Sequence, residues 1–465
     1  MARIAPLILA LCALVALAVP GVAAASKTQS MTFEAPVDLS DPASRVGALD
    51  EIGSFGVKSL RIVVLWKNVA PAATSRVKPG FDATDPAGYD WSGYDGQVDA
   101  AVQRGWKVLI TLSGPVPVWA TNGAKDDRTR PKPKEFEQFV TAAARHWSSK
   151  VSRWSIWNEP NQPQFLLPQY SAGKHVPLSP RIYRNLFFAA RRGFAAAGQG
   201  NAQVLVAETS PRGTGKVVAP LTFLRGMLCL DSKYRKIGTC AKLEADGYAH
   251  HAYTTASGPL FKPSQPNDVT IGVISRLVTA LDKAARAGAI AADMPIHLTE
   301  FGIQSKPDPI YGVSMARQSD YRSIAELLAW QQPRVVAFSQ YLLRDDPSQP
   351  NAPLVARYPG FESGLRFNDG GAKPALTGFR LPLAALRRGS RVSLWGLVRP
   401  ATARTSVTVE YSSGGSWRKL FTTTTDARGY FQRATTFRSG RRYRLTWTAP
   451  DGQTLHGTAT SVYKR

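Results

Sequence analysis

Short apolar runs of strand-like composition alternate with longer segments of helical periodicity from residue 31 to about residue 380. This alternation is typical of parallel βα units, in which each helix returns the chain to the start of the next strand. We expect eight strands, at Met31–Glu34, Ser59–Leu65, Lys107–Leu112, Val151–Trp157, Gln203–Ala207, Ala245–His250, Pro295–Thr299 and Val335–Leu342.

Eight such units in about 350 residues favour a closed (β/α)₈ barrel, the TIM barrel, over an open doubly wound sheet. An open nucleotide-binding sheet would carry a glycine-rich turn after its first strand, and Glu34-Ala-Pro36 offers none. The expected helices include Tyr94–Arg104, Lys134–Trp147, Ile182–Ala197, Ile274–Ala287 and Ala316–Gln331.

The pattern changes after Pro374 to short runs rich in Val, Thr, Tyr and Trp, separated by turn signals such as Ser412–Gly415 and Asp426–Gly429. It indicates a small all-β sandwich of the immunoglobulin or fibronectin kind. The sequence therefore predicts an α/β barrel domain over residues 26–380 and a sandwich over residues 381–465. Large aromatic side chains in the sandwich have two open roles: Trp395, Trp417 and Trp447 either form its core, which we favour, or bind carbohydrate.

The first 25 residues have the layout of a secretory signal, with Arg3, an apolar run to Val22 and small residues at Ala23–Ser26. Pro6 and Pro20 bracket an apolar core that is shorter than the roughly 20 residues of a membrane-spanning helix. We expect a protein that is secreted or associated with the cell wall, with no membrane span after signal removal.

Two of the three cysteines lie outside the expected signal, Cys229 and Cys240. In an exported chain this pair favours a disulfide that closes a short loop. Metal binding is a poor alternative, because the two thiols and six scattered histidines show no ligand spacing.

The formal net charge is +25, and residues 381–465 hold 15 Lys and Arg against three Asp and Glu. Such a surplus bears on partners and solubility rather than on fold. Anionic cell-wall polymers, acidic glycans or a membrane surface are better candidates than nucleic acid for an exported protein. An equally weighted alternative is a soluble protein from an Arg-rich proteome.

The candidate chemistry lies in two segments that end strands. Trp154-Ser-Ile-Trp-Asn158-Glu159-Pro-Asn161 ends the fourth, and Pro295-Ile-His-Leu-Thr-Glu300-Phe-Gly302 ends the seventh. Carboxylates at the C-terminal ends of barrel strands face the mouth where catalytic groups of this fold sit. Retaining glycosidic cleavage needs two of them about 5–5.5 Å apart, one as proton donor and one as nucleophile.

These segments resemble glycoside hydrolase clan A, and Trp157-Asn-Glu-Pro-Asn161 is most similar to family 39, with families 5 and 51 close. The resemblance spans residues 31–380 and implies Glu159 as acid/base and Glu300 as nucleophile. It further implies that Asn158 donates to the sugar 2-hydroxyl. Arg61 matches the arginine of the clan near the nucleophile, although a structural ion pair is nearly as well supported. His251 and Tyr253 resemble its His-x-Tyr, which binds sugar and orients the nucleophile.

Other side chains at strand ends are weaker candidates. Glu34, Glu208, Asp345 and Asp346 could line the cleft and bind hydroxyls, but none carries a comparable motif. Aromatic side chains cover the apolar faces of sugars, and four follow strands two, three, four and seven. These are Trp66, Trp119, Phe165 and Tyr311, for which packing of long loops is the alternative.

The sequence thus predicts a retaining glycoside hydrolase with no metal or organic cofactor, and the resemblance implies β-linked oligo- or polysaccharides or arabinofuranosides as substrates. Two alternatives stay open. One is a carbohydrate or cell-wall binding protein that keeps the barrel without turnover, and the other is a transglycosylase that passes the glycosyl group to a second sugar.

Overall fold

The computed structural model describes residues 25–173 and 175–465, so the expected signal over residues 1–25 lies almost entirely outside the described part. Eight parallel strands form a closed barrel, which confirms the predicted fold, and β1 pairs with both β2 and β8. The strands are β1 (Ser30–Glu34), β2 (Ser59–Leu65), β3 (Lys107–Ser113), β4 (Arg153–Ile156), β5 (Val204–Thr209), β6 (Gly247–His251), β7 (Ile296–Glu300) and β8 (Val335–Tyr341).

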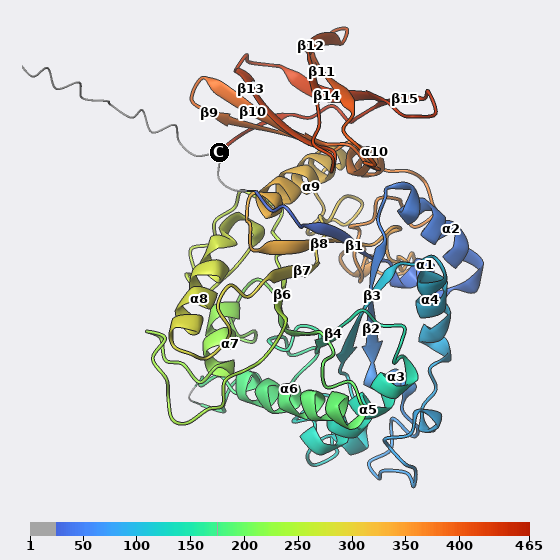
Figure 1. Cartoon of the computed structure of the whole chain (residues 1–465), viewed down its shortest axis with the longest axis vertical. Helices are drawn as coiled ribbons and strands as arrows, with labels where there is room; N and C mark the ends of the chain where they lie inside the picture. Colours follow the sequence, from blue (N-terminus) through green and yellow to red (C-terminus); the bar gives the residue numbers. More distant parts are fainter. Residues whose placement is uncertain (1–24, 174) are drawn as a thin grey trace, which may run out of the picture.

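The helices surround the barrel (Figure 1), and the longer ones bury apolar residues on their inner faces. In α5, for example, Phe136, Phe139 and Val140 are fully buried. The α-helices are α1 (Pro36–Ser40), α2 (Pro42–Ser54), α3 (Trp66–Val69), α4 (Ser92–Gln103), α5 (Pro133–His146), α6 (Ser179–Ala196), α7 (Pro220–Met227), α8 (Ser275–Arg286), α9 (Met315–Trp330) and α10 (Pro374–Arg380). No helix of the described residues is long and apolar enough to cross a membrane.

The C-terminal domain consists of two four-stranded sheets, ordered β13-β10-β9-β16 and β12-β11-β14-β15, which confirms the predicted all-β domain. Val392, Leu394, Val409 and Leu445 fill the space between the sheets. The strands are β9 (Leu383–Arg388), β10 (Arg391–Leu397), β11 (Ser406–Ser412), β12 (Arg418–Thr424), β13 (Tyr430–Thr436), β14 (Arg442–Thr448), β15 (Thr454–His456) and β16 (Val462–Lys464).

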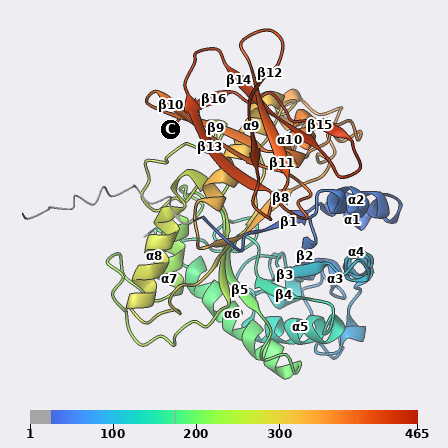
Figure 2. The same ribbon diagram turned by 45° about the horizontal axis from the view of Figure 1, so that its top comes forward.

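The sandwich packs on α9 of the barrel, as Figures 1 and 2 show. Trp395 is fully buried, with its ring centroid 6.0 Å from that of Trp330 on α9. Arg399 donates to the carbonyl of Phe379 at 2.7 Å and forms a buried ion pair with Glu326 of α9. Trp395 therefore serves packing between the domains rather than carbohydrate binding.

The same domain holds the first residues of the barrel. Arg428 donates to the carbonyl oxygens of Ser26, at 2.8 Å, and of Gln29, just before β1. The hydroxyl of Ser26 donates to the carbonyl of Val335, the first residue of β8. The C-terminal domain thus helps to fix the pairing of β1 with β8, which closes the barrel.

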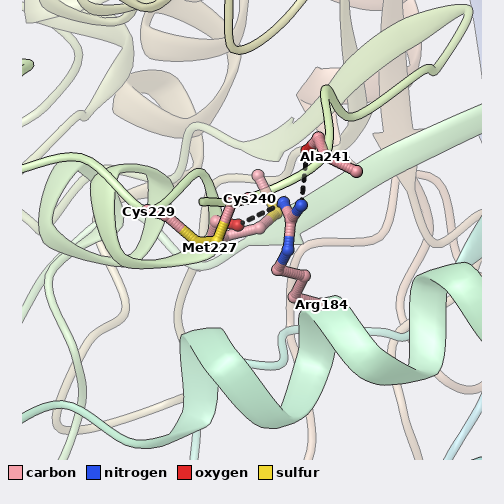
Figure 3. The surroundings of a disulfide bond; sticks show 5 residues. All are labelled: Arg184, Met227, Cys229, Cys240 and Ala241. Atoms are coloured by element: carbon pink, nitrogen blue, oxygen red, sulfur yellow. Dashed lines mark hydrogen bonds between the residues drawn. A yellow bond between two sulfur atoms is a disulfide. The ribbon is translucent and has the colours of Figure 1, made fainter. Parts of the chain in front are cut away.

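Cys229 and Cys240 form a disulfide, as predicted from the sequence. It closes the loop between α7 and β6, next to Arg184 of α6 (Figure 3). The Arg184 guanidinium donates to the carbonyls of Met227 and Ala241, one on either side of the bridge. The disulfide and the arginine therefore fix this loop to α6.

Candidate active site

The segment after β4 carries Asn158 and Glu159 on an unusual backbone. Trp157 and Glu159 have φ angles of 69° and 39°, in the left-handed region that non-glycine residues rarely adopt. The turn is held by two hydrogen bonds: the amide of Glu159 donates to the carbonyl of Glu208, and the amide of Asn158 donates to Ser113 Oγ. This geometry directs the Glu159 side chain toward the barrel mouth, where it lines a cleft.

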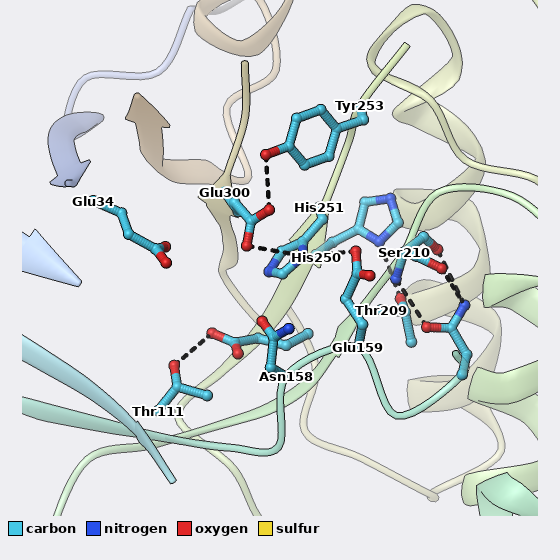
Figure 4. A network of polar contacts seen from close by, with 12 residues as sticks. Glu34, Thr111, Asn158, Glu159, Thr209, Ser210, His250, His251, Tyr253 and Glu300 are labelled. Carbon is cyan, nitrogen blue, oxygen red and sulfur yellow. Dashed lines mark hydrogen bonds and ion pairs between the residues drawn. The ribbon is translucent and has the colours of Figure 1, made fainter. Parts of the chain in front are cut away.

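Strands β6 and β7 bring the other candidate side chains to the same place (Figure 4). The Tyr253 hydroxyl donates to Glu300 Oε1 at 2.7 Å. His251 Nδ1 lies 3.0 Å from Glu159 Oε1 and 3.6 Å from Glu300 Oε2. His251 is fully buried and does not line the cleft. It contacts both carboxylates from the protein interior, so it positions these groups.

The shared histidine limits how far apart the two carboxylates lie. Because one nitrogen is 3.0 Å from the first oxygen and 3.6 Å from the second, those oxygens are separated by at most about 6.6 Å. Retaining glycosidases hold their carboxylates about 5–5.5 Å apart, whereas inverting enzymes need about 6.5–9.5 Å. The upper limit thus lies at the very start of the inverting range.

Arg61 of β2 lies beneath the cleft and is fully buried. Its guanidinium donates to Glu300 Oε2 at 3.1 Å and to Asn158 Oδ1 at 2.7 Å. It also pairs with Glu34 and, through two nitrogens, with Glu208 at 2.8 and 3.2 Å. Arg61 therefore combines the two roles left open by the sequence, since it contacts the candidate nucleophile and also forms a structural ion-pair network.

The pKa values of the two candidate catalytic carboxyls, Glu159 and Glu300, are shifted in opposite directions. Burial raises the pKa of Glu159, and this effect outweighs the lowering by the hydrogen bond with His251. Burial also acts to raise the pKa of Glu300, but His251, Arg61 and Tyr253 outweigh it, so that pKa lies below its ordinary value. His251 in turn has a raised pKa, because the nearby Glu300 and Glu159 outweigh its burial.

Glu34 and Glu208 are the two acidic neighbours whose placement the sequence left open. Glu34 lines the cleft, and burial raises its pKa to about 7 despite the lowering effect of Arg61. Glu208 is fully buried and accepts from Thr111 Oγ1 at 3.1 Å as well as from Arg61. Only Glu34 is therefore placed to meet a ligand. Asp345 is also buried, in an ion pair with Lys373 at 2.6 Å.

The cleft has a volume of about 850 Å³ and opens at the C-terminal ends of the strands. Besides the acidic groups, its lining includes residues that the sequence did not single out. They include aromatic side chains on α4, at the end of β8 and on the loops after β4 and β8, and the spacing of these residues in the sequence carries no motif. They are Phe165, Tyr94, Tyr341 and Phe361, of which only Phe165 was predicted.

Trp66 and Trp119 do not line the cleft, contrary to the prediction that they cover sugar faces. Their exposed fractions are 0% and 2%, and their rings meet edge to face at 5.9 Å. Trp66 also stacks on Phe139 of α5, with the centroids 5.0 Å apart. Both rings instead form core between the barrel and α5, the packing role that was their alternative. Tyr311 is 63% exposed and lies outside the cleft as well.

Within the described residues, no cluster of three or more His, Cys, Asp or Glu side chains has the arrangement of a metal site.

His250, next to His251 in sequence, is hydrogen-bonded to Thr209 Oγ1 at 3.0 Å and to the carbonyl of Val269 at 2.8 Å. Burial lowers its pKa to about 4, so it is neutral and structural.

No protein-family model matches the sequence, and no curated protein matches it either. Solved structures do match. A glucosidase from Croceicoccus marinus aligns with a TM-score of 0.51 at 12% identity, over 90% of this chain and 94% of that one. The GH39 enzyme from Xanthomonas axonopodis pv. citri aligns with a TM-score of 0.51 at 15% identity, over 94% and 96%. The chain shares the fold of family 39 glycoside hydrolases.

A monomeric β-xylosidase from Caulobacter crescentus is similar to the same extent, with a TM-score of 0.50 at 15% identity, over 91% of this chain and 97% of that one. The family 39 fold extends over both domains here, because each alignment covers at least 90% of the chain. The comparison therefore agrees with the clan A resemblance of the two strand-end motifs.

Proposed function

We propose that the protein is a secreted retaining glycoside hydrolase, with Glu159 as general acid/base and Glu300 as nucleophile. The observation that carries the proposal is the pair of carboxylates that share His251 at 3.0 and 3.6 Å and have opposite pKa shifts. Two carboxyl groups whose environments separate their pKa values are suited to separate acid and nucleophile roles.

In the first step, Glu300 attacks the anomeric carbon while Glu159 delivers its proton to the departing glycosidic oxygen. Arg61 and the Tyr253 hydroxyl keep Glu300 ionised for this attack. Asn158, whose Oδ1 accepts from Arg61, has its amide nitrogen fixed in orientation, and we assign it to the sugar 2-hydroxyl. A covalent glycosyl-enzyme forms at Glu300.

In the second step, Glu159 has lost its proton and acts as base on a water molecule. The water attacks the anomeric carbon, the bond to Glu300 breaks, and the sugar leaves with its original configuration. When His251 is protonated, its charge stabilises the ionised form of Glu159, because the two groups lie 3.0 Å apart.

For the substrate, we propose β-linked glycosides. The structural neighbours named as a glucosidase and a β-xylosidase support glucosides and xylosides as the first compounds to assay. The aromatic side chains of the cleft, Tyr94, Phe165, Tyr341 and Phe361, are suited to the apolar faces of such sugars. Export is supported by the disulfide between Cys229 and Cys240, since such bonds persist in oxidising compartments.

The stereochemistry of the product tests the mechanism directly. Proton NMR of an aryl β-glycoside digest is expected to show the β-anomer of the released sugar first, followed by mutarotation. Initial release of the α-anomer would contradict the retaining mechanism. Adding an acceptor alcohol separates hydrolysis from transglycosylation, because a transglycosylase gives mainly the new glycoside.

We also expect a bell-shaped dependence of kcat/KM on pH. Activity requires ionised Glu300, so it is lost as the pH falls through the lowered pKa of that group. It requires protonated Glu159, so it is lost as the pH rises through the raised pKa of this second group. On a substrate with an activated leaving group, Glu159→Gln is expected to remove the alkaline limb and keep the acid limb. An unchanged alkaline limb in this variant would assign the limb to another residue.

A further inference from the structure

A second cavity, of about 700 Å³, lies at the N-terminal ends of the strands, on the side of the barrel opposite the catalytic cleft. Barrel interiors are usually filled with branched side chains such as Val, Ile and Leu. Here the interior positions near this end carry small polar residues, including Thr32, Ser59 and Ser339. Because these side chains are short, they leave room for the cavity at this end of the barrel.

The charged side chains that line the cavity all have one sign. They are Lys58, Lys107 and Arg153, and no carboxylate is among the lining residues. Arg153 is held in place by two hydrogen bonds to Gln203 Oε1, at 3.2 and 2.9 Å. Asp246, which acts electrostatically on Arg153, lies outside the lining, and its carboxylate accepts from the amide of Val204. The lining is therefore arranged to attract an anion.

Two buried hydroxyls within the lining have no hydrogen-bond partner in the described protein. They are Thr299 Oγ1 and Ser339 Oγ, on residues with exposed fractions of 2% and 0%. A buried polar group without a partner is destabilising, so nearly all such groups in proteins are paired with protein, water or ligand. Both residues belong to the lining of the cavity, so a ligand that reaches these hydroxyls supplies the partner that each lacks.

His297 completes the inner wall. Burial lowers its pKa to about 3, so the ring is neutral and offers one donor and one acceptor. The ring has room only because residue 247 is glycine, since a Cβ there would lie 2.7 Å from His297 Cδ2. The cavity thus joins a cationic rim to a neutral wall of donors and acceptors.

We propose that this cavity binds a phosphorylated polyol, such as a sugar phosphate. The phosphate contacts Arg153, Lys107 and Lys58 at the rim, and the polyol hydroxyls bond to Thr299, Ser339 and His297 inside. This site does not depend on the catalytic carboxylates, because it lies on the opposite side of the barrel. The same chemistry occurs in free sugar phosphates and in phosphorylated polymers, which the experiment distinguishes.

Isothermal titration calorimetry of the full protein at low salt tests the site. D-glucose 6-phosphate is expected to bind at least about tenfold more tightly than inorganic phosphate and far more tightly than D-glucose. A poly(glycerol phosphate) polymer of matched phosphate content forms the second arm. Tighter binding of the polymer per phosphate would identify a polymeric ligand, and tighter binding of the monomer would identify a free sugar phosphate; either result supports the site.

Matched variants locate the binding. Arg153→Gln is expected to weaken binding of D-glucose 6-phosphate at least about tenfold, because a charge-assisted hydrogen bond is lost. Lys216→Gln removes the same charge from an exposed loop at the other end of the barrel and is expected to leave the affinity unchanged. Thr299→Val removes an unpaired hydroxyl at constant shape, so it is expected to weaken binding without lowering the melting temperature.

Three results would overturn the proposal. The first is a lack of measurable binding of either phosphorylated probe. The second is equal affinity for inorganic phosphate and D-glucose 6-phosphate, which would remove the role of the hydroxyl wall. The third is equal weakening by Arg153→Gln and Lys216→Gln, which would reduce the effect to overall charge.

Discussion

Replacing Glu300 by alanine is expected to lower kcat on an aryl β-glycoside by at least about 10⁴-fold. The variant has no group that forms the glycosyl-enzyme, and loss of a nucleophile in other covalent mechanisms has effects of this order. The space left by the side chain lies beside Arg61 and Tyr253, which contact the carboxylate in the native protein. Azide at high concentration is expected to occupy it and to restore turnover as the α-glycosyl azide.

Glu244→Ala is the matched control, because Glu244 is an exposed glutamate outside the cleft. It is expected to retain native kcat. If Glu300→Ala keeps more than a tenth of the native rate, Glu300 is not the nucleophile. Formation of the β-azide by Glu300→Ala would contradict the assignment as well, because that product requires an intact covalent intermediate.

Deleting residues 381–465 is expected to lower the melting temperature of the barrel by at least about 10 °C and to abolish activity on soluble substrates at moderate temperature. The deletion removes Trp395 from its contact with Trp330 and Arg399 from its buried ion pair with Glu326. It also removes Arg428, which holds the carbonyls that precede β1. Thermal unfolding followed by circular dichroism measures the change.

Two point variants separate packing from other effects of the deletion. Trp395→Ala is expected to destabilise the full protein by about 3–5 kcal/mol, because it leaves a cavity at the interface. Trp417→Ala removes a ring just before β12 of the other sheet, next to Arg444, and is expected to change stability by less than about 1 kcal/mol. A truncated barrel with native melting temperature would show that the two domains are energetically independent.

The strands of the barrel could be predicted from the sequence because each is a short apolar run flanked by turn residues. Ser59–Leu65 agrees with β2 at both ends. At the catalytic face the agreement is poorer, since β5 continues to Thr209 through positive φ angles at Ala207 and Glu208. These irregular residues bring Glu208 beside Arg61, and backbone irregularity of this kind has no signal in apolar periodicity.

The candidate acid and nucleophile were identifiable because chemistry fixes both their residue type and their place at strand ends. For aromatic residues, the sequence did not distinguish those that line the cleft from those that pack in the core. Trp66 follows β2 as a sugar-binding tryptophan would, but it starts α3 and turns toward Phe139. Where an aromatic ring points depends on long-range packing. For this reason Phe361, which lies on a loop beside Tyr341, was not predicted as part of the cleft.

The contacts of Arg428 with the residues before β1 have a consequence for the order of folding. A partner for Ser26 and Gln29 that lies some 400 positions further along the chain becomes available only when synthesis is almost complete. Since β1 also needs β8 to close the ring, the first strand stays unpaired on one edge while most of the polypeptide is made. A nascent chain with such an open edge remains unfolded for longer, which would suit the export that we propose.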